Sequence, residues 1–144
     1  MAITIHPKPG QILLCDFSRG FSEPEMVKSG RPVIILTGTT VSRPNLVTVV
    51  PLSTKEPDPI MPYHYQLPRN CMPQIGRFQD SDSWVKGDLL YTVGFHRLDL
   101  IRLGKRDSDG KRQYFRNRLG RDRMREIYSS VLHGLNLGHL SKHI

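Results

Sequence analysis

The sequence predicts a mainly β protein: a small barrel of short strands with one α-helix packed on it near the C-terminus. Eleven prolines and twelve glycines among 144 residues favour short strands and turns over a bundle of helices. Apolar runs bounded by turn-forming residues predict about five to seven strands. A helical period appears only near the end of the chain, in apolar residues spaced i, i+3, i+4, i+7, i+8 and i+11: Met124, Ile127, Tyr128, Val131, Leu132 and Leu135.

The first half of the chain carries the clearest strand signals. Residues 11–17 (QILLCDF) predict the first strand, and the glycines, serines and proline of 20–30 (GFSEPEMVKSG) predict a loop after it. The runs 32–38 (PVIILTG) and 46–52 (LVTVVPL) are almost continuously apolar, which is typical of strands buried on both faces. We expect 39–45 (TTVSRPN) to form the hairpin connection between these two strands.

The next segment is predicted to alternate between loops and strands. Three prolines in 55–62 (KEPDPIMP) predict a loop, 63–67 (YHYQL) a short edge strand, and 68–76 another loop. Residues 84–103 predict one or two strands with a kink at Gly87 or Gly94.

The last third of the chain is predicted to hold a charged loop and the helix. The loop is expected at 105–118, where Asp109-Gly110 is a strong turn signal. The helix is expected over about 120–136, with Asp122 in its first turn. We expect residues 1–144 to form a single domain.

The charge of the chain favours a polyanionic partner. The net charge is +8, and residues 73–144 hold 14 Lys or Arg against 8 Asp or Glu. Cations that neutralise phosphates release condensed counterions, although a solvated basic face is the equally simple alternative. Cys15 and Cys71 have no metal-ligand spacing, and we expect neither a metal nor a cofactor. Without a long apolar segment, the sequence predicts no membrane span and a reducing, cytoplasmic location.

One pattern predicts a site for an anion. Arg31 stands with a proline at the entrance of the 32–38 strand, and Ser53 and Thr54 leave the end of the 46–52 strand. A guanidinium offers a planar fork to phosphate oxygens, and hydroxyls can donate to the same group.

These residues belong to an ordered set of motifs that resembles the MazF/PemK toxins of bacterial toxin–antitoxin modules. The segments PGQILLCDFS, GRPVIIL and VVPLST follow one another as in that family, and VKGDLLYT (85–92) resembles a later family segment with a basic residue, a spacer and an aspartate. The close match covers residues 9–54 and 84–92, and the order of elements fits the whole chain.

The resemblance implies a fold, an activity and partners. It implies an SH3-like barrel of the PemK/CcdB type with a C-terminal helix, which works as a homodimer and is neutralised by an acidic antitoxin protein. It also implies metal-independent cleavage of single-stranded RNA, including mRNA. The ribose 2′-hydroxyl attacks its own phosphate in that reaction, giving a 2′,3′-cyclic phosphate and a 5′-hydroxyl.

The resemblance assigns catalytic candidates residue by residue. Arg31 takes the place of the family arginine and would stabilise charge in the transition state, because a guanidinium does not readily release a proton. Ser53 takes the place of a catalytic threonine, and Thr54 is the neighbouring candidate. The alternatives are an Arg31 ion pair with Glu23 or Glu25 and a local turn or cap at the Ser-Thr pair.

Three further residues are candidates for proton transfer. Lys86 and Asp88, at i and i+2, share a face if the segment stays extended, and a surface ion pair is the equally simple alternative. Glu23 lies in a loop where the family carries a histidine or glutamate nearer the first glycine. Glu23 is therefore either the acid–base carboxylate or a solvated loop charge.

We also predict residues that bind RNA. Basic and aromatic side chains interleave in 111–118, and unpaired bases stack on aromatic rings while cations hold phosphates. Tyr91 and Phe95, which lie in an apolar run, are expected in the core instead. The RNA-binding candidates are Lys28, Lys55, Tyr114, Phe115 and Arg116.

Two other classes of function are compatible with this sequence. One is a non-catalytic protein on the same barrel, either an inhibitor of gyrase type or a nucleic-acid-binding regulator. The other is an SH3-like module that binds peptides, which gives no reason for the positive charge.

Overall fold

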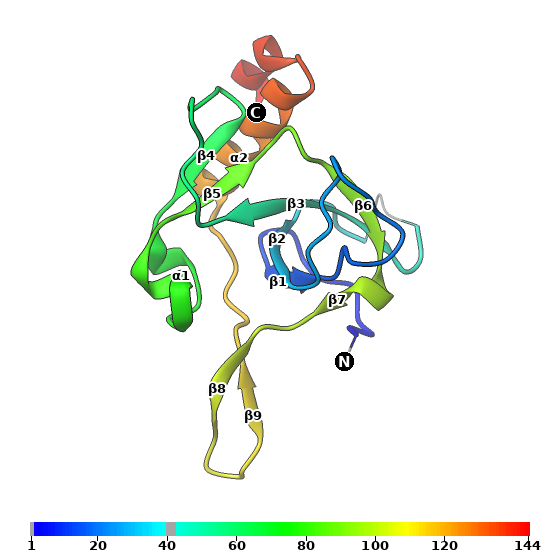
Figure 1. The fold of residues 1–144 in the computed structure, drawn as a ribbon, viewed down its shortest axis with the longest axis vertical. Coiled ribbons are helices and arrows are strands. Elements are labelled where there is room, and N and C mark those ends of the chain that lie inside the picture. The colour runs from blue at the N-terminus through cyan, green and yellow to red at the C-terminus, as the bar shows by residue number, and fades with distance from the viewer. Residues whose placement is uncertain (1, 40–42) are drawn as a thin grey trace.

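The computed structural model describes residues 2–39 and 43–144 (Figure 1). Its strands are β1 Ile12–Cys15, β2 Arg31–Ile35, β3 Leu46–Ser53, β4 His64–Leu67, β5 Ser83–Lys86, β6 Tyr91–Gly94, β7 Leu98–Asp99, β8 Arg102–Arg106 and β9 Arg112–Tyr114. Its α-helices are α1 Gly76–Asp80 and α2 Arg121–Gly134, and short 3-10 turns cover η1 Arg69–Cys71, η2 Phe95–Arg97 and η3 Gly138–His143.

A seven-stranded antiparallel sheet forms the body of the protein. Six strands follow the order β4-β5-β3-β2-β1-β7, and β6 pairs with β3. The long strand β3 therefore pairs twice on one side, with β6 at Leu46–Val49 and with β5 at Leu52 and Ser53. The sheet curls without closing, which is compatible with the predicted SH3-like barrel and α+β class.

Both faces of this sheet are buried, as the continuous apolar runs of β2 and β3 predict. One face packs against α2 through residues such as Ile34, Leu52 and Ile127. The opposite face buries a second cluster that includes Val33, Val49 and Phe17. Alternation along each strand thus divides the side chains between two cores.

Helix α2 buries the apolar stripe that its sequence period predicts. Met124, Ile127 and Val131 are buried, and the hydroxyl of Tyr128 donates to the carbonyl oxygen of Leu36 at 2.6 Å. The stripe ends before Leu135, which is 52% exposed. None of the helices in the described part of the chain is long and apolar enough to cross a membrane.

The predicted strand region 84–103 is more broken than its sequence indicates. β5 ends at Lys86, and a turn follows in which Leu89 N–H donates to the carbonyl oxygen of Lys86 at 3.0 Å. A Cβ on Gly87 would lie 2.5 Å from the carbonyl oxygen of Ser130, so this turn sits directly on α2. The close packing explains why a glycine is needed there.

Other segments also differ from the sequence-based expectation. The short elements η1 and α1 occupy part of the region expected to be a loop, whereas β4 is an edge strand as predicted. The connection expected at 39–45 includes residues 40–42, which lie outside the described residues.

The charged segment near residue 110 forms a β-hairpin. Among the strands of the described residues, β8 and β9 pair only with each other, and they project from the body on the side away from the C-terminal helices (Figure 1). The expected turn at Asp109-Gly110 lies at its tip, where Gly110 has a positive φ of 78°.

Candidate functional site

Arg31 is fixed at the first position of β2, directly opposite Cys15 of β1. Its Nη1 donates a hydrogen bond of 3.1 Å to the carbonyl oxygen of Leu52 on β3. Because residues i and i+2 of a strand share a face, the Arg31 side chain lies on the face that carries Val33 and Ile35, away from α2.

The Arg31 guanidinium has no carboxylate partner among the residues that the structure describes. Its Nε is buried without a hydrogen-bond partner. Partial burial is the main factor that lowers its pKa, and the positive charge of Arg77 on α1 lowers it further. Two guanidinium groups near one another without a compensating acid favour the binding of an anion between them.

Ser53 lies at the end of β3 on the same face as Arg31. If the β2–β3 register, which pairs Val33 with Pro51, continues for two residues, Arg31 stands opposite Ser53, with Cα atoms about 5 Å apart. Ser53 Oγ is buried and accepts a hydrogen bond of 3.2 Å from Lys55 N–H. The local turn that was the alternative for the Ser-Thr pair is therefore present, and the Ser53 hydroxyl can still donate. Thr54 is half-buried, just beyond the strand.

Lys86 lies on this face as well, because it follows two residues after Trp84, the partner of Ser53 across the sheet. Lys86 lies one strand farther across the sheet than Ser53 and two residues farther along its strand. This places its Cα on the order of 12 Å from the Cα of Arg31. The expectation that Asp88 shares this face through an extended segment is wrong, since the chain turns at residues 87–88. Asp88 is instead exposed in that turn.

His64 joins Lys86 and Asp88 in a second charged cluster, which the sequence analysis missed. His64 pairs directly with Lys86 across β4 and β5. Its Nδ1 accepts the N–H of Met61 at 3.0 Å, so the neutral ring carries its proton on Nε2. Partial burial lowers the pKa of His64, Asp88 opposes this effect, and Lys86 adds to it. No local sequence pattern marks His64, and only the pairing of β4 with β5 brings it to Lys86.

The loop 20–30 brings no carboxylate to Arg31. Glu23 and Glu25 are exposed, and the described residues contain no ion pair between either of them and Arg31. The carboxylate of Glu25 instead accepts the N–H of Ser22 at 3.4 Å. Lys28 is exposed in the same loop.

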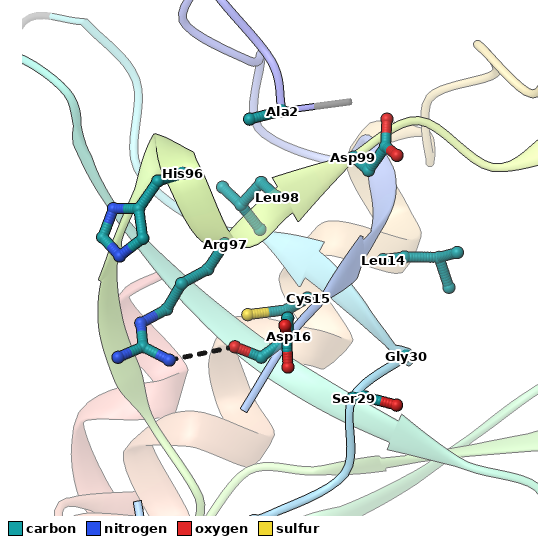
Figure 2. Close-up of a pocket in the computed structure, with 10 residues that line it drawn as sticks. All are labelled: Ala2, Leu14, Cys15, Asp16, Ser29, Gly30, His96, Arg97, Leu98 and Asp99. Carbon is teal, nitrogen blue, oxygen red and sulfur yellow. Dashed lines mark hydrogen bonds between the residues drawn. The ribbon is translucent and has the colours of Figure 1, made fainter. Parts of the chain in front are cut away.

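A cavity of about 240 Å³ lies beside the entrance to β2, bordered by Gly30, Cys15, Asp16 and Arg97 (Figure 2). Arg97 Nη1 donates to the carbonyl oxygens of Asp16 at 3.0 Å and Arg19 at 2.7 Å, which ties down the chain after β1. Burial raises the pKa of the Cys15 thiol to about 12, so it is not a nucleophile at neutral pH. The thiol therefore adds no nucleophile to this cavity.

The predicted RNA-binding residues separate into buried and exposed groups. The assignment of Phe115 is wrong, because its ring is only 8% exposed and belongs to the core beneath α2. Phe95 is buried and Tyr91 packs against the other core, as expected. Tyr114 is half-buried beneath the guanidinium of Arg116, which lies 5.8 Å from the ring centre. Lys55 and Arg116 are exposed.

Solved structures of toxins share this fold. A mycobacterial endoribonuclease in complex with its cognate antitoxin matches 91% of this chain and 96% of its own, with a TM-score of 0.57 and 19% identity. The Mycobacterium tuberculosis toxin MazF-mt6 matches over 90% and 98% of the two chains, with a TM-score of 0.53 and 19% identity. MazF from Deinococcus radiodurans matches over 92% and 99%, with a TM-score of 0.59 and 12% identity.

The sequence itself gives the family. Residues 8–133 match the model of the PemK-like, MazF-like toxins of type II toxin–antitoxin systems, and the chain belongs to this family. An uncharacterized Escherichia coli (strain K12) protein, YifN, is 29% identical over 153 aligned positions, which cover 94% of this chain and 96% of YifN. The resemblance that the ordered motifs indicate is thereby confirmed.

Proposed function

We propose that this protein is the toxin of a type II toxin–antitoxin system and cleaves single-stranded RNA without a metal ion. The observation that carries the proposal is the unpaired Arg31 guanidinium, held beside Arg77 and the end of β3. A cation without a carboxylate partner at this place is suited to a phosphodiester, whose charge grows as the 2′-hydroxyl attacks.

We assign the scissile phosphate to Arg31 and the hydroxyl of Ser53 or Thr54. Arg31 supplies charge and Ser53 a hydrogen bond, and neither has to transfer a proton. The products are a 2′,3′-cyclic phosphate and a 5′-hydroxyl.

We assign proton transfer to the second cluster. His64 can take the proton of the 2′-hydroxyl at Nδ1 once the hydrogen bond from Met61 N–H opens, and Lys86 can return a proton to the departing 5′-oxygen. The Asp88 charge favours protonated His64 after the transfer and opposes the larger effect of burial, which lowers the pKa of the imidazole. Glu23 has no part in this scheme because it is exposed and unconnected to Arg31.

As partners we propose an acidic antitoxin and a second copy of this chain, in the cytoplasm. The net charge of +8 suits an acidic partner, and the similar mycobacterial endoribonuclease was solved with its cognate antitoxin.

The test is cleavage of mixed-sequence single-stranded RNA by the purified protein in excess EDTA. We expect fragments whose 5′ ends are labelled by a kinase without prior phosphatase treatment, and no cleavage of the same RNA carrying 2′-O-methyl groups. Arg31→Ala should lower the rate about 100-fold or more. Arg125→Ala, which removes an exposed arginine from α2, serves as the matched control. Intact RNA with the wild-type protein would overturn the proposal.

A further inference from the structure

We infer that the β8–β9 hairpin is an arm that binds the phosphate backbone of single-stranded RNA outside the catalytic site. This inference rests on the proposed function, from which it takes single-stranded RNA as the substrate. The arm projects from the body and pairs with no other strand (Figure 1), and most of β8 is exposed. It is therefore available to a partner along its length.

The arm concentrates the charge of the whole chain. Residues 102–118 hold seven Lys or Arg and two Asp, a net charge of +5 out of +8. The carboxylate of Asp107 is held in the turn, where its Oδ1 accepts the N–H groups of Asp109 at 2.9 Å and Lys111 at 3.0 Å. No cation of the arm forms an ion pair within the described part of the chain.

Cationic side chains of the arm stand opposite one another across the hairpin. Arg106 pairs directly across the hairpin with Arg112, an arrangement that destabilises a strand pair in the absence of an anion. Together with Arg102 and Lys105 they border a hollow of about 280 Å³. A phosphate group seated there would relieve the repulsion among these side chains, which is the reason to expect an anion at this place.

An aromatic side chain favours a single strand over a duplex. Tyr114 stands opposite Arg102 at the base of the hairpin, with Arg116 5.8 Å from its ring centre. An aromatic ring beside cations is the arrangement on which an unpaired base stacks while its phosphates are held. A duplex offers no unstacked base to this ring.

Further arginines lie on the elements that follow the arm toward the body. A pocket of about 180 Å³ is bordered by Arg118, at the end of the segment 102–118, by Arg123 of α2 and by residues of η1. Element η1 packs against α1, which carries Arg77. An RNA strand that left the arm along these elements would meet Arg118, Arg123 and Arg77.

The test measures RNA binding separately from cleavage. A fluorescent 2′-O-methyl RNA oligonucleotide, which lacks the attacking hydroxyl, is titrated with the full chain at several NaCl concentrations. The variant K105Q/K111Q/R112Q removes three exposed cations of the arm, and K8Q/R125Q/K142Q removes three exposed cations elsewhere. Both variants have the same net charge, so any difference between them in RNA binding reflects where on the protein the removed cations lie.

We expect the arm variant to lower the slope of log K against log [NaCl] by about 2, since each contact with a single strand contributes about 0.7. Its affinity at 0.15 M salt should fall tenfold or more, while the control variant changes little. Equal slopes and affinities for the two variants would overturn the inference. It would also be overturned if the arm variant weakened binding only to polyglutamate, or if a duplex of the same sequence bound the arm as tightly as the single strand.

Failure of this inference is distinguishable from failure of the proposed function. Cleavage of unmodified RNA by the wild-type protein, without dependence of binding on the arm, would exclude the arm alone. Binding that depends on the arm, without any cleavage, would exclude the ribonuclease activity alone.

Discussion

Arg77 lies close enough to Arg31 for its positive charge to lower the pKa of the Arg31 guanidinium, and partial burial lowers it more strongly. The Nε of Arg31 is at the same time buried without a hydrogen-bond partner. Both features oppose folding in the absence of a bound anion, so the site is maintained against the stability of the protein.

Arg31→Met should therefore separate stability from activity. Replacing a poorly compensated charge by an apolar side chain of similar length is neutral or stabilising, so the free energy of unfolding should fall by less than about 1 kcal/mol or rise. RNA cleavage should fall about 100-fold. Chemical denaturation and cleavage assays on one preparation provide the measurement. A loss of stability above about 2 kcal/mol would show that Arg31 is mainly structural.

Gly87→Ala should destabilise the protein by about 2 kcal/mol or more, because overpacking a close contact forces the backbone apart. The new Cβ would lie 2.5 Å from the carbonyl oxygen of Ser130 and 2.8 Å from that of Tyr63. Gly30→Ala is the control, since nothing lies within 4 Å of its Cβ position. Thermal unfolding of the two variants gives the comparison, and equal melting temperatures would contradict the close packing of β5 on α2.

The adjacent aromatic residues Phe115 and Tyr114 should respond in opposite ways. Phe115→Ala removes a ring from the core and should cost about 3 kcal/mol or more of stability. Tyr114→Ala should cost much less than this, yet weaken binding of single-stranded RNA, because a base loses its stacking partner. Urea denaturation and oligonucleotide titration measure the two effects. A large stability loss for Tyr114→Ala would place that ring in the core as well.

His64 should make the protein less stable as the pH falls below neutrality. Its folded-state pKa is lower than the ordinary value of 6.5, mainly because of burial, so the unfolded chain binds the proton first. The contribution of His64 is complete above pH 6.5 and is lost as the pH falls from there toward the folded-state pKa. His64→Gln should reduce the decline in melting temperature between pH 7 and 5, and an unchanged decline would argue against this assignment.

The two thiols should differ in reactivity. Cys15 is fully buried with its pKa raised to about 12, whereas Cys71 is partly exposed. We expect one fast reaction per folded chain with a disulfide reagent at pH 8, because only a thiolate attacks. Cys71→Ser should abolish the fast reaction, and guanidinium chloride should restore a reaction at Cys15. Fast labelling of Cys15 in the folded protein would indicate that the edge between β1 and β7 opens.

Much of the fold could be predicted from local patterns. The apolar period of α2 and the apolar runs of β2 and β3 are local signals, and the structure places elements at all three. A kink at Gly87 or Gly94 was predicted, but the full turn that ends β5 at Lys86 was not, because it depends on how closely Gly87 approaches α2. Phe115 was misassigned for a similar reason: its charged neighbours indicate exposure, but its N–H donates to Ile101 at the point where the hairpin returns to the core.

The residues of the candidate site also divide into those with a local sequence signal and those without one. Arg31, Ser53 and Lys86 belong to strands whose order in the sequence already identified them. Arg77 and His64 lie in segments without a distinctive sequence pattern, and only the three-dimensional arrangement brings them near the other charges. Residues that become neighbours only when the chain packs are not marked by any local pattern in a single sequence.

The pairing of β1 with β7 has a consequence for the timing of synthesis. Leu14 pairs with Asp99, and α2 covers the sheet only with residues up to Gly134. Strand β1 must wait until Asp99 has left the ribosome before the sheet is complete, and until Gly134 has left it before α2 covers the sheet. Any activity that depends on the covered sheet therefore begins only after the residues up to Gly134 have been synthesised.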